Sequence, residues 1–234
     1  MSNVLRIKRS LISVSDKEKI IPFARDLAKK NIGIISTGNT FKELKKNKIN
    51  VTNIEEATSF PEILSGRVKT LHPKIFGGIL ANNLDQSHIR QLKQHDILAI
   101  QLVVVNLYPF EETIKNSNNI NKCIENIDIG GPSLIRAAAK NFLSTAIVTD
   151  KEDYKKVIDE IKKLDGISIK LRKFLAIKAF KKTMHYDNAI FNWFSNKITK
   201  NKEEYLFLEG KKIEDLRYGE NPHQVASIFS FNNK

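Results

Sequence analysis

Ala99–Val105, which reads AIQLVVV, is the segment that most constrains how this chain can fold. It is apolar except for Gln101, and its three valines are β-branched residues that favour strands. A strand without polar alternation is covered on both faces, as in parallel sheets flanked by helices. Because other apolar runs alternate with amphipathic stretches along the chain, the sequence predicts an α/β fold.

Further strands and helices are expected on either side of this segment. The expected strands are Leu5–Val14, Ile32–Ser36, Val51–Ile54 and Thr145–Thr149, and the expected helices end near Lys30 and Lys46 or cover Gln86–His95 and Pro132–Lys140. After Lys151 the pattern predicts helices in series, at Asp153–Leu164, Lys170–Lys182 and Tyr186–Lys197, with a break at residues 164–166. We therefore expect a layered α/β/α core in residues 1–150 and a C-terminal helical annex in residues 151–208.

Composition narrows the class of protein. The net charge of +13 attracts polyanions, but the lysines are spread along the chain and no RNP-like or helix-turn-helix pattern accompanies them, so we expect no nucleic-acid partner. The chain has one cysteine, no signal peptide and no apolar run of about 18 residues, which favours a cytoplasmic location without a membrane partner. No His or Cys pair has zinc-ligand spacing, so no metal is expected.

The stretch Gly66–Lys74, reading GRVKTLHPK, concentrates cations between two ordinary segments. Arg67 offers a planar fork for phosphate, and Lys69 offers a point charge. His72, in the same stretch, is the histidine that we consider nearest to chemistry. The stretch is either an anion-binding loop or a solvated turn, and the polar segments at other strand ends favour the first interpretation.

Ser36-Thr37-Gly38 follows an expected strand and precedes an expected helix. Ligands of open α/β sheets lie outside the carboxyl ends of strands, where helix N-termini offer free N–H groups to phosphate. Hydroxyl groups next to a glycine suit such a phosphate nest. The alternative is that Thr40 merely caps the helix. Neither a Walker loop nor a dinucleotide fingerprint is present.

Asp128-Ile129-Gly130-Gly131-Pro132 opens the expected helix that carries Lys140. Asp128 is either a helix cap or an acid–base group, and Lys140 either complements the helix dipole or transfers protons. Jointly, an acid and a base around a glycine turn suit proton transfer.

Taken together, these segments resemble the bifunctional purine-biosynthesis enzymes that join an AICAR transformylase to an IMP cyclohydrolase. The resemblance rests on LISVSDK (11–17), ISTG (35–38), FPE (60–62), GRVKTLHPK (66–74), VNLYPF (105–110), ENIDIGGP (125–132), LIRAAAKN (134–141) and LRYGENPHQ (216–224). It implies a methylglyoxal-synthase-like layered α/β domain with a mostly parallel sheet, and a cyclohydrolase that closes the ring of a ribonucleotide without a cofactor.

The resemblance also implies roles for individual residues. Lys69, Tyr108, Asp128 and Lys140 would lie at the reacting ring, with Asp128 and Lys140 transferring protons. The residues that would hold the nucleotide are Ser13, Ser15, Lys17, Ser36, Thr37, Gly38, Arg67, Thr70, Asn106, Ile129, Gly130 and Gly131. Residues 209–234 would be a linker and the first segment of a transformylase part, whose substrate Arg217 and Tyr218 would bind.

The bulk of a transformylase part is not in the sequence, so 10-formyltetrahydrofolate and a homodimer are expected only of a longer protein. A second departure from the family is Asn39, where the family usually has a second glycine; asparagine tolerates left-handed geometry, so we expect the turn to survive. The alternative function is a regulatory nucleotide-binding module of the same fold without turnover. Lyase chemistry like that of methylglyoxal synthase is disfavoured by the ribotide-type motifs.

Overall fold

The computed structural model describes residues 3–199 and 210–231, and its centre is a five-stranded parallel sheet. The strands lie in the order β4-β3-β2-β5-β6, and they are β2 (Arg9–Ser13), β3 (Gly33–Ser36), β4 (Thr52–Asn53), β5 (Leu102–Val105) and β6 (Ala146–Val148). The α/β class and the parallel sheet predicted from the sequence are confirmed.

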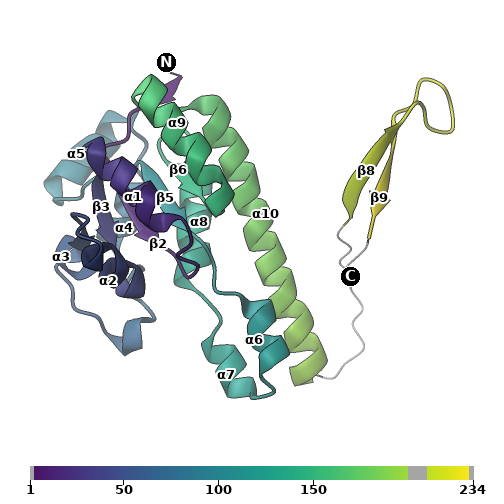
Figure 1. The fold of residues 1–234 in the computed structure, drawn as a ribbon, viewed down its shortest axis with the longest axis horizontal. Helices are drawn as coiled ribbons and strands as arrows, with labels where there is room; N and C mark the ends of the chain where they lie inside the picture. The colour runs from purple at the N-terminus through teal and green to yellow at the C-terminus, as the bar shows by residue number, and fades with distance from the viewer. Residues whose placement is uncertain (1–2, 200–209, 232–234) are drawn as a thin grey trace. The chain divides into compact units, whose positions relative to one another are not determined.

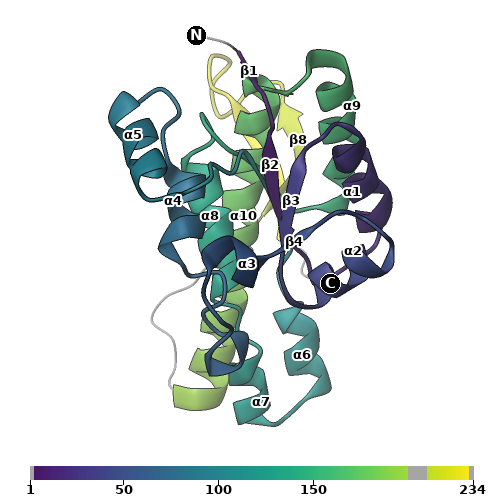
Figure 2. The same cartoon turned by 90° about the vertical axis from the view of Figure 1, so that its left-hand side faces the viewer.

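Strand β5 lies between β2 and β6, and all four of its residues are buried. Helices α1 (Ile20–Lys29) and α9 (Tyr154–Leu164) cover one face of the sheet, and α4 (Pro73–Leu80) and α8 (Gly130–Lys140) cover the other (Figures 1 and 2). Both faces of β5 are therefore excluded from water, which is why its sequence carries no polar alternation.

The core on the α1 face joins early and late parts of the chain. Phe23 of α1 and Val157 of α9 belong to one buried cluster with Ile12, Ile34 and Val104 of the sheet. Burial of each such side chain contributes about 1.5–3 kcal/mol. The helical region after residue 151 thus shares its core with the strands of the first 150 residues.

The remaining short elements lie mostly at the ends of the strands. They are α2 (Gly38–Lys46), α3 (Ile54–Thr58), η1 (Leu64–Gly66), α5 (Gln86–Gln94), α6 (Phe110–Asn116), α7 (Ile120–Glu125) and η2 (Lys151–Asp153). Among the described residues, no helix is long and apolar enough to cross a membrane.

Helix α10 spans Ile169–Phe194 without interruption, so the prediction of two helices with a gap at residues 183–185 is wrong. The gap contains neither Gly nor Pro, and Thr183 is buried and donates its hydroxyl to the Phe180 carbonyl, which keeps it inside the helix. Arg172 of α10 donates to the Phe142 carbonyl just before β6, and Lys178 pairs with Asp150 just after it. Helix α10 therefore lies beside the edge strand β6 (Figure 1).

The expected first strand, Leu5–Val14, is two strands in the structure. Strand β1 (Val4–Leu5) pairs antiparallel with β7 (Ile167–Ser168), and β2 begins only at Arg9. Gly166 makes the first pairing possible, because a Cβ at that position would collide with the Leu5 carbonyl. The apolar pattern alone could not show that the chain changes partner between residues 5 and 9.

The chain divides into two compact units, residues 1–190 and residues 191–234. In the second unit, β8 (Lys211–Leu216) and β9 (Ala226–Ser230) form an antiparallel hairpin. The loop between them is closed by a hydrogen bond from the Gly219 N–H to the Gln224 carbonyl at 2.9 Å. The domain boundaries expected from the sequence stay predictions, and residues 200–208 of the expected annex lie outside the described residues.

Candidate functional site

Polar side chains gather at the carboxyl ends of β2 and β5. Asn106, directly after β5, accepts hydrogen bonds through Oδ1 from the Ser15 N–H at 2.6 Å and the Ser15 hydroxyl at 3.0 Å, and its Nδ2 donates to the Asp16 carbonyl. Lys17 donates to the Ser15 carbonyl at 3.2 Å. These contacts fold the turn after β2, so Asn106 holds the shape of the site as well as lining it. Ser13, the last residue of β2, is half-buried beside this turn.

At the end of β3, each of three hydroxyl groups has a different environment. Ser36 is fully buried and donates to the Ile12 carbonyl at 2.7 Å, and Thr40 exchanges hydrogen bonds with both backbone groups of Val14. Thr37 is the N-cap of α2 but makes no capping bond, and its buried Oγ1 has no hydrogen-bond partner within the described part of the chain. The interpretation of Thr40 as a simple cap is therefore wrong. Thr37 and the first amides of α2 are left for an anion.

Gly38 takes the left-handed backbone conformation of this turn, with φ at +54°. Asn39 lies inside α2 with ordinary helical geometry. The expectation that Asn39 has to tolerate left-handed geometry is wrong, because Gly38 alone makes the turn. Asn39 in place of the family's second glycine therefore costs no backbone strain.

The cationic loop folds back onto this turn. Lys69 Nζ lies 3.2 Å from the place where a Cβ on Gly38 would be and 3.0 Å from the same place on Gly66. Two glycines thus leave room for the ammonium group, which also lies 3.5 Å from Glu62 Oε2. The cation and the turn after β3 thus form one cluster with the chemistry of an anion site.

Thr70, in the same loop, contacts the first residue of α8, Gly130. Its Oγ1 would lie 2.6 Å from a Cβ on Gly130, so only glycine fits there. Gly131 is equally confined, since a Cβ would collide with the Asp128 carboxylate and lie 2.8 Å from Leu107 Cδ2. These contacts place Asp128 between the cationic loop and the end of β5.

Asp128 is largely buried, and this burial raises the pKa of its carboxyl above the ordinary value. Hydrogen bonds from the Gly131 and Gly130 amides lower the pKa, but their effect is smaller than that of burial. Asp128 Oδ1 accepts the bond from the Gly131 N–H at 2.8 Å. Asp128 therefore has the geometry of a helix cap and the electrostatics of a proton-transfer group at once.

Sequence reasoning missed Tyr186 of α10. Its hydroxyl accepts a hydrogen bond from the Asp128 N–H at 2.7 Å, and its ring meets Phe110 edge-on at 6.2 Å. Tyr186 is buried and so fixes the Asp128 turn from the helical region after residue 151. No local signal marks it, because its partner is 58 residues away in the chain.

Three predicted residues have environments that differ from those of this cluster. Lys140 is exposed at the opposite end of α8 from Asp128, and 11 residues rising about 1.5 Å each separate the two ends by about 16 Å. Tyr108 is exposed after β5, and Arg67 turns away to pair with Glu125 of α7, its Nε lying 3.2 Å from Oε1. Within a single chain, the turn of Asp128 therefore lies close to Thr70, and Lys69 lies close to Gly38. Lys140 does not lie close to Asp128.

The remaining residues that the sequence singled out lie outside this cluster or have a structural role. His72 caps α4 by accepting from the Lys74 N–H at 3.1 Å, which is a structural role. Ile129 is exposed at the start of α8. Arg217 and Tyr218 belong to the second unit, at the end of β8 and in the loop that follows. In residues 3–199 and 210–231, no group of three or more His, Cys, Asp and Glu side chains could hold a metal ion.

Two family models match the chain. The MGS-like domain matches residues 19–133, and the AICARFT/IMPCHase bienzyme matches residues 138–234. The crystal structure of ForH superposes with a TM-score of 0.72 at 31% identity, covering 80% of this chain and 99% of that one. The parallel sheet with its covering helices is thus that of an MGS-like α/β domain, as the resemblance implied.

Curated relatives identify the family within that class. The bifunctional purine biosynthesis protein PurH of Parvibaculum lavamentivorans is 48% identical over 97% of this chain, and those of Thermoanaerobacter sp. and Clostridium botulinum are 49% and 50% identical over 95% and 96% of it. The chain belongs to the AICARFT/IMPCHase bienzyme family, which confirms the resemblance. It spans less than half the length of these relatives, covering 42% to 44% of each.

Proposed function

We propose that this chain is an IMP cyclohydrolase unit, which closes 5-formamido-imidazole-4-carboxamide ribotide to inosine monophosphate and releases water. The observation that carries the proposal is the contiguity of the cluster. Lys69 lies against Gly38, next to Thr37, whose hydroxyl has no partner among the described residues, and Thr70 contacts the turn of Asp128. A phosphate site and a buried carboxyl group are thereby joined by one loop.

Ring closure needs the carboxamide nitrogen to attack the formyl carbon. The new C–N bond turns the formyl oxygen into an oxyanion, and the carboxamide nitrogen loses one proton. The formamido nitrogen loses a second proton and forms the ring C=N bond as the C–O bond breaks, so the oxygen takes up two protons and leaves as water. A carboxyl group with a raised pKa is suited to move such protons, and Asp128 is assigned this role. Lys69, with Tyr108, would position and polarise the substrate, and the ammonium group would stabilise the oxyanion.

The nucleotide would be held at the strand ends. Thr37 and the amides after Gly38 suit the phosphate, and the turn of Ser15 and Lys17, clasped by Asn106, suits the ribose side. Holding both reacting groups of one molecule in place removes much of the entropic barrier.

The proposal is tested by incubating the purified chain with the formylated ribotide and following formation of inosine monophosphate. Turnover supports it. A folded chain that binds inosine monophosphate but does not cyclise the ribotide would instead support the regulatory module, and in that case Asp128→Asn would leave binding unchanged.

Lys140→Ala is expected, from the family resemblance, to slow cyclisation roughly 10²–10⁴-fold and to leave nucleotide affinity nearly unchanged. The measurements are steady-state rates and titration with inosine monophosphate. The arrangement within one chain does not explain such a loss, because Lys140 lies about 16 Å along α8 from the Asp128 end. A rate within twofold of the unaltered chain would remove Lys140 from the site.

Arg67→Ala is expected to weaken nucleotide binding more than it slows turnover, because a guanidinium fork meets phosphate alike in the ground and transition states. In the structure Glu125 occupies that fork, so Glu125→Gln is the matched control and should leave affinity unchanged or increase it. If Arg67→Ala lowers kcat while affinity stays the same, this role of Arg67 is wrong.

Deletion of residues 210–234 should leave cyclisation nearly unchanged. The β8–β9 hairpin makes its own ladder of hydrogen bonds, and the family role of Arg217 and Tyr218 belongs to the transformylase reaction, with 10-formyltetrahydrofolate as its second substrate. Rates and thermal unfolding of the shortened chain check this expectation. A large loss of either would place the hairpin within the cyclohydrolase unit. Homodimer formation stays a prediction for a longer protein.

A further inference from the structure

The Tyr186 hydroxyl is a buried polar group that contacts the backbone of Asp128. Tyr186 is 7% exposed, and its oxygen accepts the hydrogen bond from the Asp128 N–H at 2.7 Å. The Asp128 carboxylate is held separately, because its Oδ1 accepts from the Gly131 N–H at 2.8 Å. The turn that presents this carboxyl group is therefore fixed from two elements: α8 holds the side chain, and α10 holds the backbone.

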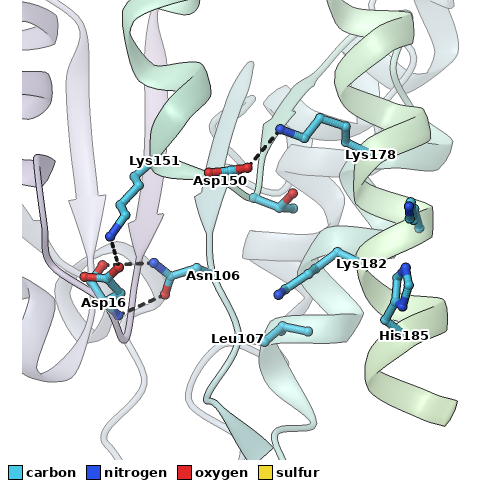
Figure 3. Close-up of a pocket in the computed structure, with 10 residues that line it drawn as sticks. Asp16, Asn106, Leu107, Asp150, Lys151, Lys178, Lys182 and His185 are labelled. Carbon is cyan, nitrogen blue, oxygen red and sulfur yellow. Dashed lines mark hydrogen bonds and ion pairs between the residues drawn. The ribbon is translucent and has the colours of Figure 1, made fainter. Parts of the chain in front are cut away.

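The place of Tyr186 is set by how α10 is attached to the sheet. Lys178 of α10 reaches Asp150, just after β6, at 3.0 Å (Figure 3), and it also pairs with the buried Asp153. Arg172 donates to the Phe142 carbonyl at 2.8 Å. Tyr186 follows Lys178 in the same unbroken helix, about 12 Å further along its axis at 1.5 Å per residue. A rigid helix that is anchored at β6 thus delivers the hydroxyl to Asp128.

The ring of Tyr186 is fixed as well as its hydroxyl. It meets Phe110 edge-on, with 6.2 Å between the ring centroids, and Phe110 is 1% exposed. Burial, opposed by the hydrogen bond from the Asp128 N–H, raises the pKa of the Tyr186 phenol above its ordinary value of 10.0. The group is therefore a neutral hydroxyl near neutral pH, and it adds no charge that would repel the Asp128 carboxylate.

We propose that Tyr186 is a positioning residue for cyclisation, whose hydroxyl holds the Asp128 N–H and thereby keeps the Asp128 carboxyl group oriented for proton transfer. The inference rests on the proposed function, because Tyr186 acts through Asp128. Small displacements of a reacting group are costly, and about 1 Å can slow a reaction roughly 10²-fold. The helical region after residue 151 is then part of the catalytic unit and not only a support for the sheet.

The first test compares kcat with KM in Tyr186→Phe, which removes the hydroxyl and keeps the ring against Phe110. We expect kcat to fall roughly 10–10²-fold, while KM for the formylated ribotide and the affinity for inosine monophosphate stay within about twofold. Tyr154→Phe is the matched control. It removes the same group from a buried ring on α9 that stacks on Phe23 at 4.4 Å, and its kcat should stay within about twofold of the unaltered chain.

The second test does not depend on catalysis. Hydrogen exchange of the Asp128 amide, followed by NMR in the labelled chain, should be about tenfold faster in Tyr186→Phe, as expected for the loss of one hydrogen bond. It should be unchanged in Tyr154→Phe. Thermal unfolding of each variant is measured first, and rates are compared well below the unfolding midpoints, so that partial unfolding does not contribute to them.

The outcomes separate this inference from the proposed function. If the unaltered chain cyclises the ribotide and Tyr186→Phe has the same kcat, the inference is overturned and the proposed function stands. Equal losses in the two tyrosine variants, a parallel fall of kcat and affinity, or unchanged exchange of the Asp128 amide would overturn it as well. If the unaltered chain shows no turnover, the proposed function fails, and the inference fails with it.

Discussion

Asp128→Asn is expected to lower the rate of cyclisation roughly 10²–10⁴-fold, the usual cost of losing a general acid or base. Asparagine keeps an oxygen that can accept the Gly131 N–H, so the turn that opens α8 should persist. Nucleotide affinity is therefore expected to change little. Steady-state rates, inosine monophosphate titration and thermal unfolding of the variant check the three expectations.

Exposed Asp159→Asn on α9 is the matched control for the same chemical change outside the site, and its rate should equal that of the unaltered chain. An equal fall in affinity and rate for Asp128→Asn would show that Asp128 holds the substrate and does not transfer protons.

The pH dependence follows from the raised pKa of Asp128. The folded chain binds this proton more tightly than the unfolded chain, so the stability that Asp128 contributes is greatest below the ordinary pKa of 3.8 and declines as the pH rises toward the folded pKa. Asp128→Asn lacks this decline, and its stability relative to the unaltered chain should increase over that window. If Asp128 acts as a base, the rate of the unaltered chain should fall as the pH drops through a pKa above 3.8.

Lys69→Met is expected to lower both affinity and rate, with a loss in kcat of about 10²–10³-fold if the ammonium group stabilises the oxyanion. Methionine keeps an unbranched stem between Gly38 and Gly66, so the loop should stay folded. Lys74→Met removes the same charge from the first turn of α4, just after this loop, and is the control. Similar losses in the two variants would mean that the loop acts only through its overall charge.

The sequence alone determined the class of fold. Ala99–Val105 has no polar alternation because β5 is covered on both faces, and α9 ends at Asp165, which takes the left-handed conformation at the C-cap. These signals depend only on local conformation and on burial. Where tertiary contacts decide, the sequence was insufficient. Leu5 pairs with β7, and α10 runs on through Thr183 beside the edge strand, where Arg172 and Lys178 contact the residues that flank β6.

In the candidate site, the sequence determined which residue types stand at the strand ends, and the motifs were sufficient to indicate the family. The tertiary structure decided which of them are available for chemistry. The hydroxyls of Ser36 and Thr40 bond neighbouring backbone, whereas the Thr37 hydroxyl has no partner within the part of the chain that the structure describes. The burial that raises the pKa of Asp128, and the bond from Tyr186 that fixes its turn, depend on elements far along the chain. Hydrogen-bond partners and desolvation arise only when those elements pack, so no local pattern could have specified them.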